Sequence, residues 1–80
     1  MIEWPAEDNL TDVMKSNLAR FKKTAGALEL EEDAQTWGFH ALSRLPDPPL
    51  RAILHNENGD EVTFVMEPEG RWSMRRKDRV

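Results

Sequence analysis

Two short turns, each ending in glycine, constrain the fold of this chain more than any other feature. Residues 57–59 and 68–70 separate three runs of alternating apolar and polar residues, at about residues 50–55, 61–67 and 71–76. Glycine at the third position suits a three-residue turn closed by a β-bulge, which needs a positive φ. The pattern therefore predicts a three-stranded antiparallel meander.

Counting outward from the two turns predicts the register of the meander. The expected pairs are Leu54 with Val62, Ala52 with Phe64, Leu50 with Met66, Met66 with Trp72 and Phe64 with Met74. Because side chains alternate between the two faces of a sheet, this register makes one face apolar. The other face then carries Arg51, Ile53, His55, Glu61, Thr63, Val65, Glu67, Arg71, Ser73, Arg75 and Lys77.

A helix is predicted ahead of the meander, over about residues 10–24. One side of it would carry apolar residues at helical spacing, namely Leu10, Val13, Met14, Leu18 and Phe21. Asn9 or Thr11 is a suitable N-cap, and Gly26 would lie just past the end.

Residues 27–45 admit two interpretations. A helix from about Asp33 would place Ala34, Trp37, Ala41 and Leu45 on one side, whereas strands would alternate Leu28 with Leu30 and Trp37 with Phe39 and Ala41. We favour the helix because residues 31–35 contain no glycine, asparagine or proline for a tight turn, although Gly38 costs a helix about 1 kcal/mol. Either way, we expect an α+β fold with one or two helices packed on one face of the sheet.

Length and composition indicate a single small domain over residues 1–80, with an acidic leader at 1–8 and a proline-rich connector at 46–49. The chain has no cysteine and no apolar run of the ~18 residues that a membrane span needs. These features predict a protein of the cytoplasm that does not bind membranes.

Charge is distributed unevenly along the chain. Residues 1–70 contain fourteen acidic and six basic side chains, whereas residues 71–80 contain five basic and one acidic. A basic run can bind nucleic acid by neutralising phosphates, and this interpretation assigns a polyanion site to Arg71, Arg75, Arg76, Lys77 and Arg79. The competing interpretation is structural, since the register places Arg71 opposite Glu67 and Lys77 opposite Glu61.

The sequence gives little support for catalysis. His40 and His55 are the two histidines, fifteen positions apart, and no nucleophile motif or phosphate-binding glycine loop accompanies them. Zinc sites use more closely spaced histidines. We therefore expect no catalytic, cofactor or metal site.

The polar face of the meander is the candidate site for a partner. Its mixture of charged and aliphatic side chains, together with an unassigned tryptophan, gives a tentative partner-binding set of Trp4, Arg51, Ile53, His55, Val65 and Arg75. Trp4 could instead fold back as a lid on the core. The sequence thus predicts a small non-enzymatic regulatory or adaptor protein that binds another protein, and an inhibitor of a larger assembly is one such protein. The alternatives left open are nucleic-acid binding by the basic C-terminal strand and a homodimer formed through a sheet edge.

Overall fold

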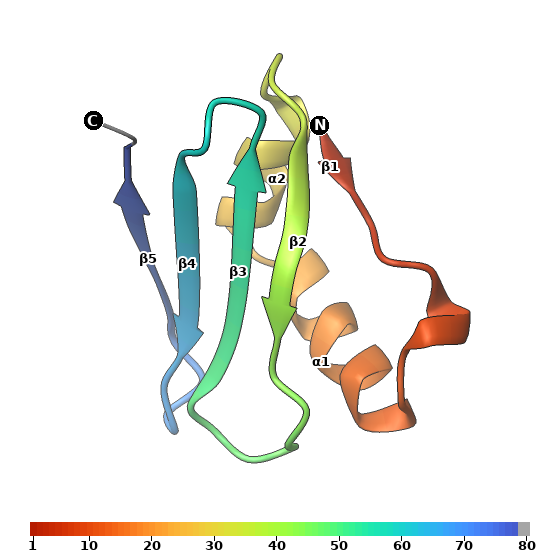
Figure 1. Cartoon of the computed structure of the whole chain (residues 1–80). Helices are drawn as coiled ribbons and strands as arrows, with labels where there is room; N and C mark the ends of the chain where they lie inside the picture. The colour runs from red at the N-terminus through yellow and green to blue at the C-terminus, as the bar shows by residue number, and fades with distance from the viewer. Residues whose placement is uncertain (79–80) are drawn as a thin grey trace.

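A five-stranded mixed sheet with two helices against one face makes up the structure, a computed structural model that describes residues 1–78 (Figure 1). The strands follow one another across the sheet in chain order, with β1 parallel to β2 and all later neighbours antiparallel. The elements are β1 (Ile2–Glu3), a short 3₁₀ turn (Glu7–Asn9), α1 (Asp12–Lys22), α2 (Ala25–Glu32), β2 (Trp37–Leu42), β3 (Leu50–Asn56), β4 (Glu61–Met66) and β5 (Trp72–Lys77).

The meander of β3, β4 and β5 confirms the predicted strands and their register. All five predicted pairs occur, from Leu50 opposite Met66 to Phe64 opposite Met74. Gly59 and Gly70 adopt φ values of 83° and 90°, which a residue with a side chain rarely takes. Glycine at the third turn position thus allows the two turns that set the register, as the sequence predicts.

The prediction of a three-stranded sheet is wrong, because β1 and β2 extend it on the side of β3. The favoured helix from Asp33 is wrong for the same segment, where residues 37–42 form a strand paired with β3. Asp33 makes the turn that the composition did not suggest: its carboxylate accepts hydrogen bonds from the Gln35 N–H at 3.0 Å and from Trp37 Nε1 at 3.1 Å. The chain can therefore reverse at residues 33–36 without glycine or proline.

The alternation of side chains between the two faces of the sheet is interrupted in the middle of β2. The register shifts between Phe39 and Ala41, so that Trp37, Phe39 and Leu42 face the helices. Trp37 is fully buried as expected, but three residues predicted to line the same side, Ala34, Ala41 and Leu45, are exposed. A bulge inserts one extra residue into a strand and so breaks strict alternation.

Both helices begin at a threonine. The Thr11 hydroxyl accepts a hydrogen bond from the Met14 N–H, and the Thr24 hydroxyl accepts one from the Ala27 N–H. The first helix is thus confirmed in place, although it ends at Lys22. Gly26 lies inside α2 rather than past a helix end.

Within residues 1–78, neither helix is long and apolar enough to cross a membrane.

Phe21 of α1 is the centre of the core and has no exposed surface. Its ring lies 4.9 Å from that of Phe64, 5.6 Å from Phe39 and 5.9 Å from Trp72, measured between centroids. Trp4 closes the cluster at 6.2 Å from Phe21. Aromatic groups at these separations and tilted angles pack favourably, so one helical side chain holds both the sheet and the N-terminal segment.

Asn17 links α1 by hydrogen bonds to the segment that leads from β2 to β3. It is 2% exposed, and its Nδ2 donates to the carbonyl oxygens of Ser43 and Leu45, each at 3.0 Å. A buried amide satisfied in this way fixes the position of the proline-rich connector relative to the helix.

Candidate functional site

The face of the sheet opposite the helices is the candidate site, and we call it the open face. It consists of the side chains that alternate away from the core on β3, β4 and β5: Arg51, Ile53, His55, Glu61, Thr63, Val65, Glu67, Ser73, Arg75 and Lys77. Figure 1 shows both helices behind the sheet and no element in front of it. The register that buries Phe64 and Val62 is therefore also what places this set in one surface.

A shallow hollow of about 610 Å³ lies on the open face, with Met74 at its edge. Ile53 stands opposite Thr63, and Val65 stands opposite both Arg51 and Ser73, so the lining mixes aliphatic and polar side chains. Ile53 and Val65 are half-buried by their neighbours. They occupy diagonal positions on adjacent strands with Thr63 beside them, and we call these two aliphatic residues the apolar strip.

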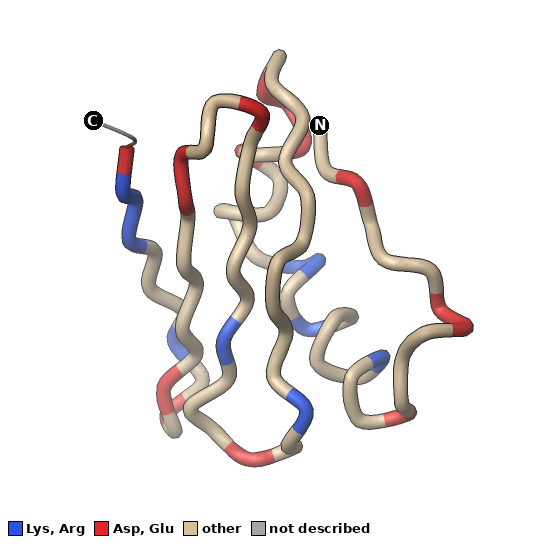
Figure 2. Tube along the Cα trace, in the orientation of Figure 1, with Lys and Arg blue, Asp and Glu red and all other residues tan. Residues whose placement is uncertain are grey.

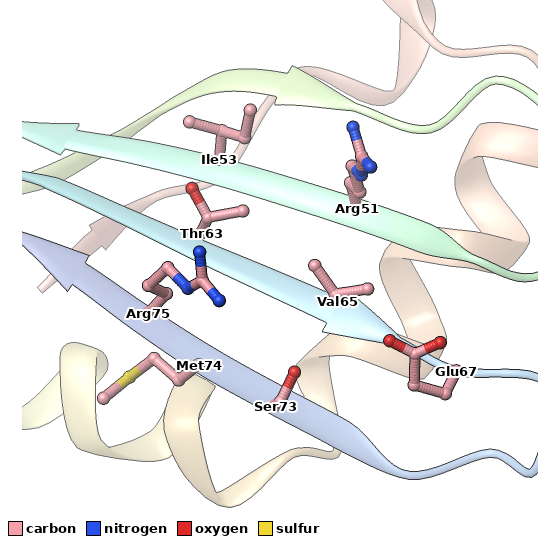
Figure 3. A pocket seen from close by; sticks show the side chains of 8 residues that line it. All are labelled: Arg51, Ile53, Thr63, Val65, Glu67, Ser73, Met74 and Arg75. Atoms are coloured by element: carbon pink, nitrogen blue, oxygen red, sulfur yellow. The ribbon is translucent and has the colours of Figure 1, made fainter.

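Two arginines border this apolar strip. Figure 3 shows Arg51 projecting from β3 and Arg75 projecting from β5, on either side of β4. Both are exposed, and neither forms an ion pair with any residue in the range 1–78. Each guanidinium can therefore offer its planar set of N–H donors to a carboxylate or phosphate from outside the chain.

Arg76 of the C-terminal strand is placed differently from Arg75. Arg76 stands opposite Val62, on the helix side, where its guanidinium lies 5.5 Å above the Trp37 ring, 2.7 Å from Asp78 and 3.8 Å from an Asp60 oxygen. The hydrogen bond with Asp78 and its charge, followed by the charges of Asp60 and Asp33, raise the pKa of Arg76. Arg76 thus stabilises the end of the sheet and does not contribute to the open face.

The predicted polyanion set is therefore split among several surfaces. Arg75 and Lys77 lie on the open face, Arg71 lies at the β4–β5 turn with Glu69 3.6 Å away, and Arg76 lies on the opposite side. Arg79 falls outside the described residues. Figure 2 shows the basic positions of β5 strung along one strand, with acidic positions in the neighbouring turns.

His55 belongs to a small polar cluster at one end of the open face. Its Nε2 lies 2.9 Å from Glu61 Oε1, and its ring stacks on that of His40 at 4.4 Å. The hydrogen bond with His55 is the main reason why the pKa of Glu61 is lowered, and the charges of His55 and Lys77 act in the same direction. Sequence reasoning missed the histidine pair, because it depends on the bulged pairing of β2 with β3.

Among residues 1–78, no group of three or more histidine, cysteine, aspartate or glutamate side chains is arranged to hold a metal ion. The His55 ring is instead positioned by Glu61 and by stacking.

Trp4 lies apart from the rest of the tentative partner-binding set. It packs on Phe21 and Phe39 on the helix side of the sheet, and the Lys22 ammonium lies 4.9 Å above its ring. Arg51, Ile53, His55, Val65 and Arg75 are brought together on the open face. Trp4 and the open face therefore cannot belong to one contact patch.

No protein family model and no solved structure matches this chain. The chain is similar to Protein CHROMATIN REMODELING 25 of Arabidopsis thaliana, with 36% identity over 72 residues. The similarity covers 74% of this chain and 8% of the length of that much larger protein.

Proposed function

We propose that this chain is a regulatory or adaptor domain that acts by binding a partner protein on its open face, without turnover of a substrate. The observation that carries the proposal is the one-sided cover of the sheet. Helices α1 and α2 bury one face, while the other leaves an aliphatic strip between two arginines that have no ionic partner among the described residues.

The composition of the open face supports a protein partner. Protein interfaces combine a central apolar contact with a polar rim, and arginine is enriched at the positions that contribute most to binding. Ile53 and Val65 supply the apolar centre, and Arg51 and Arg75 supply the rim.

Binding without turnover is supported by the state of the titratable groups. The side chains of His55 and Glu61 are 39% and 37% exposed, and the pKa of Glu61 is lowered. General acid–base catalysis by a carboxyl group usually needs the opposite shift, toward neutral pH, in a site with little water.

The proposal is tested with the double variant Ile53→Asp/Arg75→Glu. Proteins captured from a nuclease-treated extract of the native cells by the immobilised wild-type chain should be absent from the eluate of this variant. Lys15→Glu is the control for the Arg75→Glu component, because it makes the same charge change as that substitution on an exposed position of α1, on the other side of the sheet. Equal recovery of the partner by the double variant would reject the open face.

Nucleic-acid binding is a second candidate, favoured by two observations. Arg51, Arg75 and Lys77 lie on the same face, and the relative from Arabidopsis thaliana is named for chromatin remodeling. A site that neutralises three phosphates of duplex DNA would give a slope of log K against log salt of about −2.7. Binding to mixed-sequence DNA with such a slope, abolished by Arg75→Glu, would favour this candidate over a protein partner.

A further inference from the structure

Strand β5 forms a long and accessible edge of the sheet. Five of its six residues are exposed, and Figure 1 shows no element beside it. The opposite edge is β1, which is two residues long. An open edge strand can pair with an extended segment of another chain, so β5 is where such a segment would add.

The turn before β5 determines which of its backbone groups are free to pair. The Glu67 N–H donates to the Arg71 carbonyl at 3.0 Å, and the Gly70 N–H donates to the Glu67 carbonyl at 2.8 Å. Hydrogen-bonded and non-hydrogen-bonded pairs alternate in an antiparallel ladder, so Ser73, Arg75 and Lys77 bond to β4. The backbone groups of Trp72, Met74 and Arg76 consequently point away from the sheet.

The two sides of this edge differ in chemistry. On the open face, Arg75 and Lys77 form a basic row. On the helix side, Met74 is 48% exposed, next to the buried Phe64. A strand added to β5 would place alternate side chains beside these two rows, because side chains alternate in the added strand as well.

We propose that β5 binds an extended acidic segment of a partner protein as a sixth strand. Acidic side chains of the segment face Arg75 and Lys77, and its apolar side chains face Met74. The inference rests on the proposed binding function and specifies the conformation and charge of the partner. A second copy of this chain fits less well, since pairing β5 with itself would bring the two basic rows together.

The probe for this inference is a blocked peptide of about ten alternating glutamate and valine residues, long enough for one strand. It is titrated into the isotope-labelled chain, and amide hydrogen exchange is followed by NMR. The amides of Trp72, Met74 and Arg76 should become protected on saturation, whereas those of Ser73, Arg75 and Lys77 are protected already. A peptide of alternating lysine and valine should bind at least about tenfold more weakly, a factor that corresponds to about 1.4 kcal/mol.

Met74→Pro tests the backbone contact directly. Its N–H points away from β4, so proline there removes an outward donor while the β4–β5 ladder is kept. Binding of the peptide should be lost in Met74→Pro and largely kept in Met74→Ala, which retains the N–H. Circular dichroism and thermal denaturation establish that both variants are folded.

N-methylated peptides test the same contact with the wild-type chain, in case Met74→Pro fails to fold. Methylation of alternate residues blocks the N–H groups on one edge of the peptide strand. One methylated peptide should bind and the other, methylated on the complementary set, should not. Equal binding of both, or no added protection at Trp72 and Met74, would overturn the inference.

Failure of the edge can be distinguished from failure of the open face. Ile53 lies on β3, two strands from the edge, so a strand added to β5 does not contact it, whereas a peptide bound across the open face would. Binding that survives Met74→Pro and is lost in Ile53→Asp would overturn the sixth-strand inference and keep the proposed open-face function. Absence of peptide binding under all conditions would also overturn the inference.

Discussion

Gly26 shows how closely α2 packs on the sheet. A β-carbon at this position would overlap the edge of the Phe64 ring. That ring cannot move aside easily, because Phe64 is 1% exposed and its centroid lies 4.9 Å from that of Phe21. A helical glycine is therefore retained at a site where alanine would otherwise be the better helix former.

We expect Gly26→Ala to lower the free energy of unfolding by up to about 2 kcal/mol. Overpacking of a core costs about 1–3 kcal/mol, and the gain in helix propensity of about 1 kcal/mol offsets part of it. Urea denaturation measures the change. Gly38→Ala is the control, since its nearest neighbour would be the His55 carbonyl at 4.0 Å and its stability should change little. A higher free energy of unfolding in Gly26→Ala would show that the Phe64 ring moves to make room for the β-carbon.

Protonation of the Asp33 carboxylate should lower the free energy of unfolding in acid. The hydrogen bond from the Gln35 N–H, followed by that from Trp37 Nε1, lowers the pKa of Asp33 below 3.8. A carboxylate with a lowered pKa in the folded state stabilises the fold above its unfolded pKa, and this stabilisation is lost as pH falls through the folded value.

Asp33→Asn should therefore be less stable than wild type at about pH 7, with a difference that shrinks as the pH is lowered below about 4. Thermal denaturation at several pH values measures this. Asp47→Asn removes the same charge from the exposed connector and should show no such convergence. A constant difference across the pH range would mean that the two hydrogen bonds do not depend on the charge.

Among the elements, α1 is attached to the segment between β2 and β3 through the side-chain amide of Asn17. Asn17→Ala removes both hydrogen bonds to the carbonyls of Ser43 and Leu45. We expect a loss of about 1–3 kcal/mol, measured by urea denaturation, because two carbonyl oxygens in part-buried hydrogen bonds lose their donor.

Asn17→Asp is the sharper variant of the same contact. Its carboxylate has no N–H to donate and would face two carbonyl oxygens, so we expect a larger loss than in Asn17→Ala at neutral pH. Part of this loss should be recovered in acid, where a protonated carboxyl group donates one hydrogen bond. A smaller loss in Asn17→Asp than in Asn17→Ala would contradict the donor role of Asn17.

The meander could be predicted from the sequence because its determinants are local. Each hairpin turn carries its own glycine, and the alternation of β3 and β4 is uninterrupted. Strand β2 could not be predicted in the same way. Its residues that face the core are spaced two and then three positions apart, at 37, 39 and 42. That spacing fits neither a regular strand nor a regular helix, and the bulge that explains it depends on pairing with β3.

For the whole molecule, the part of the candidate site that lies on the meander could be predicted from the sequence. The residues of β3, β4 and β5 on the open face were predictable from register alone. The histidine pair and the helix-side position of Trp4 were not, since both require contacts between segments distant in the sequence. The separation of Arg76 from Arg75 follows from alternation, but its partners Trp37 and Asp60 do not.

The pairing of β1 with β2 has a consequence for the order of folding. Ile2 lies opposite Trp37, thirty-five positions along the chain, whereas β3, β4 and β5 pair across turns of a few residues. Closing a short loop costs less entropy, so the hairpins should form in the transition state and β1 should join afterwards. In stopped-flow experiments, Val62→Ala should then slow folding, while Ile2→Ala should mainly accelerate unfolding. Equal effects of Ile2→Ala on both rates would mean that the N-terminal segment is already in place when the barrier is crossed.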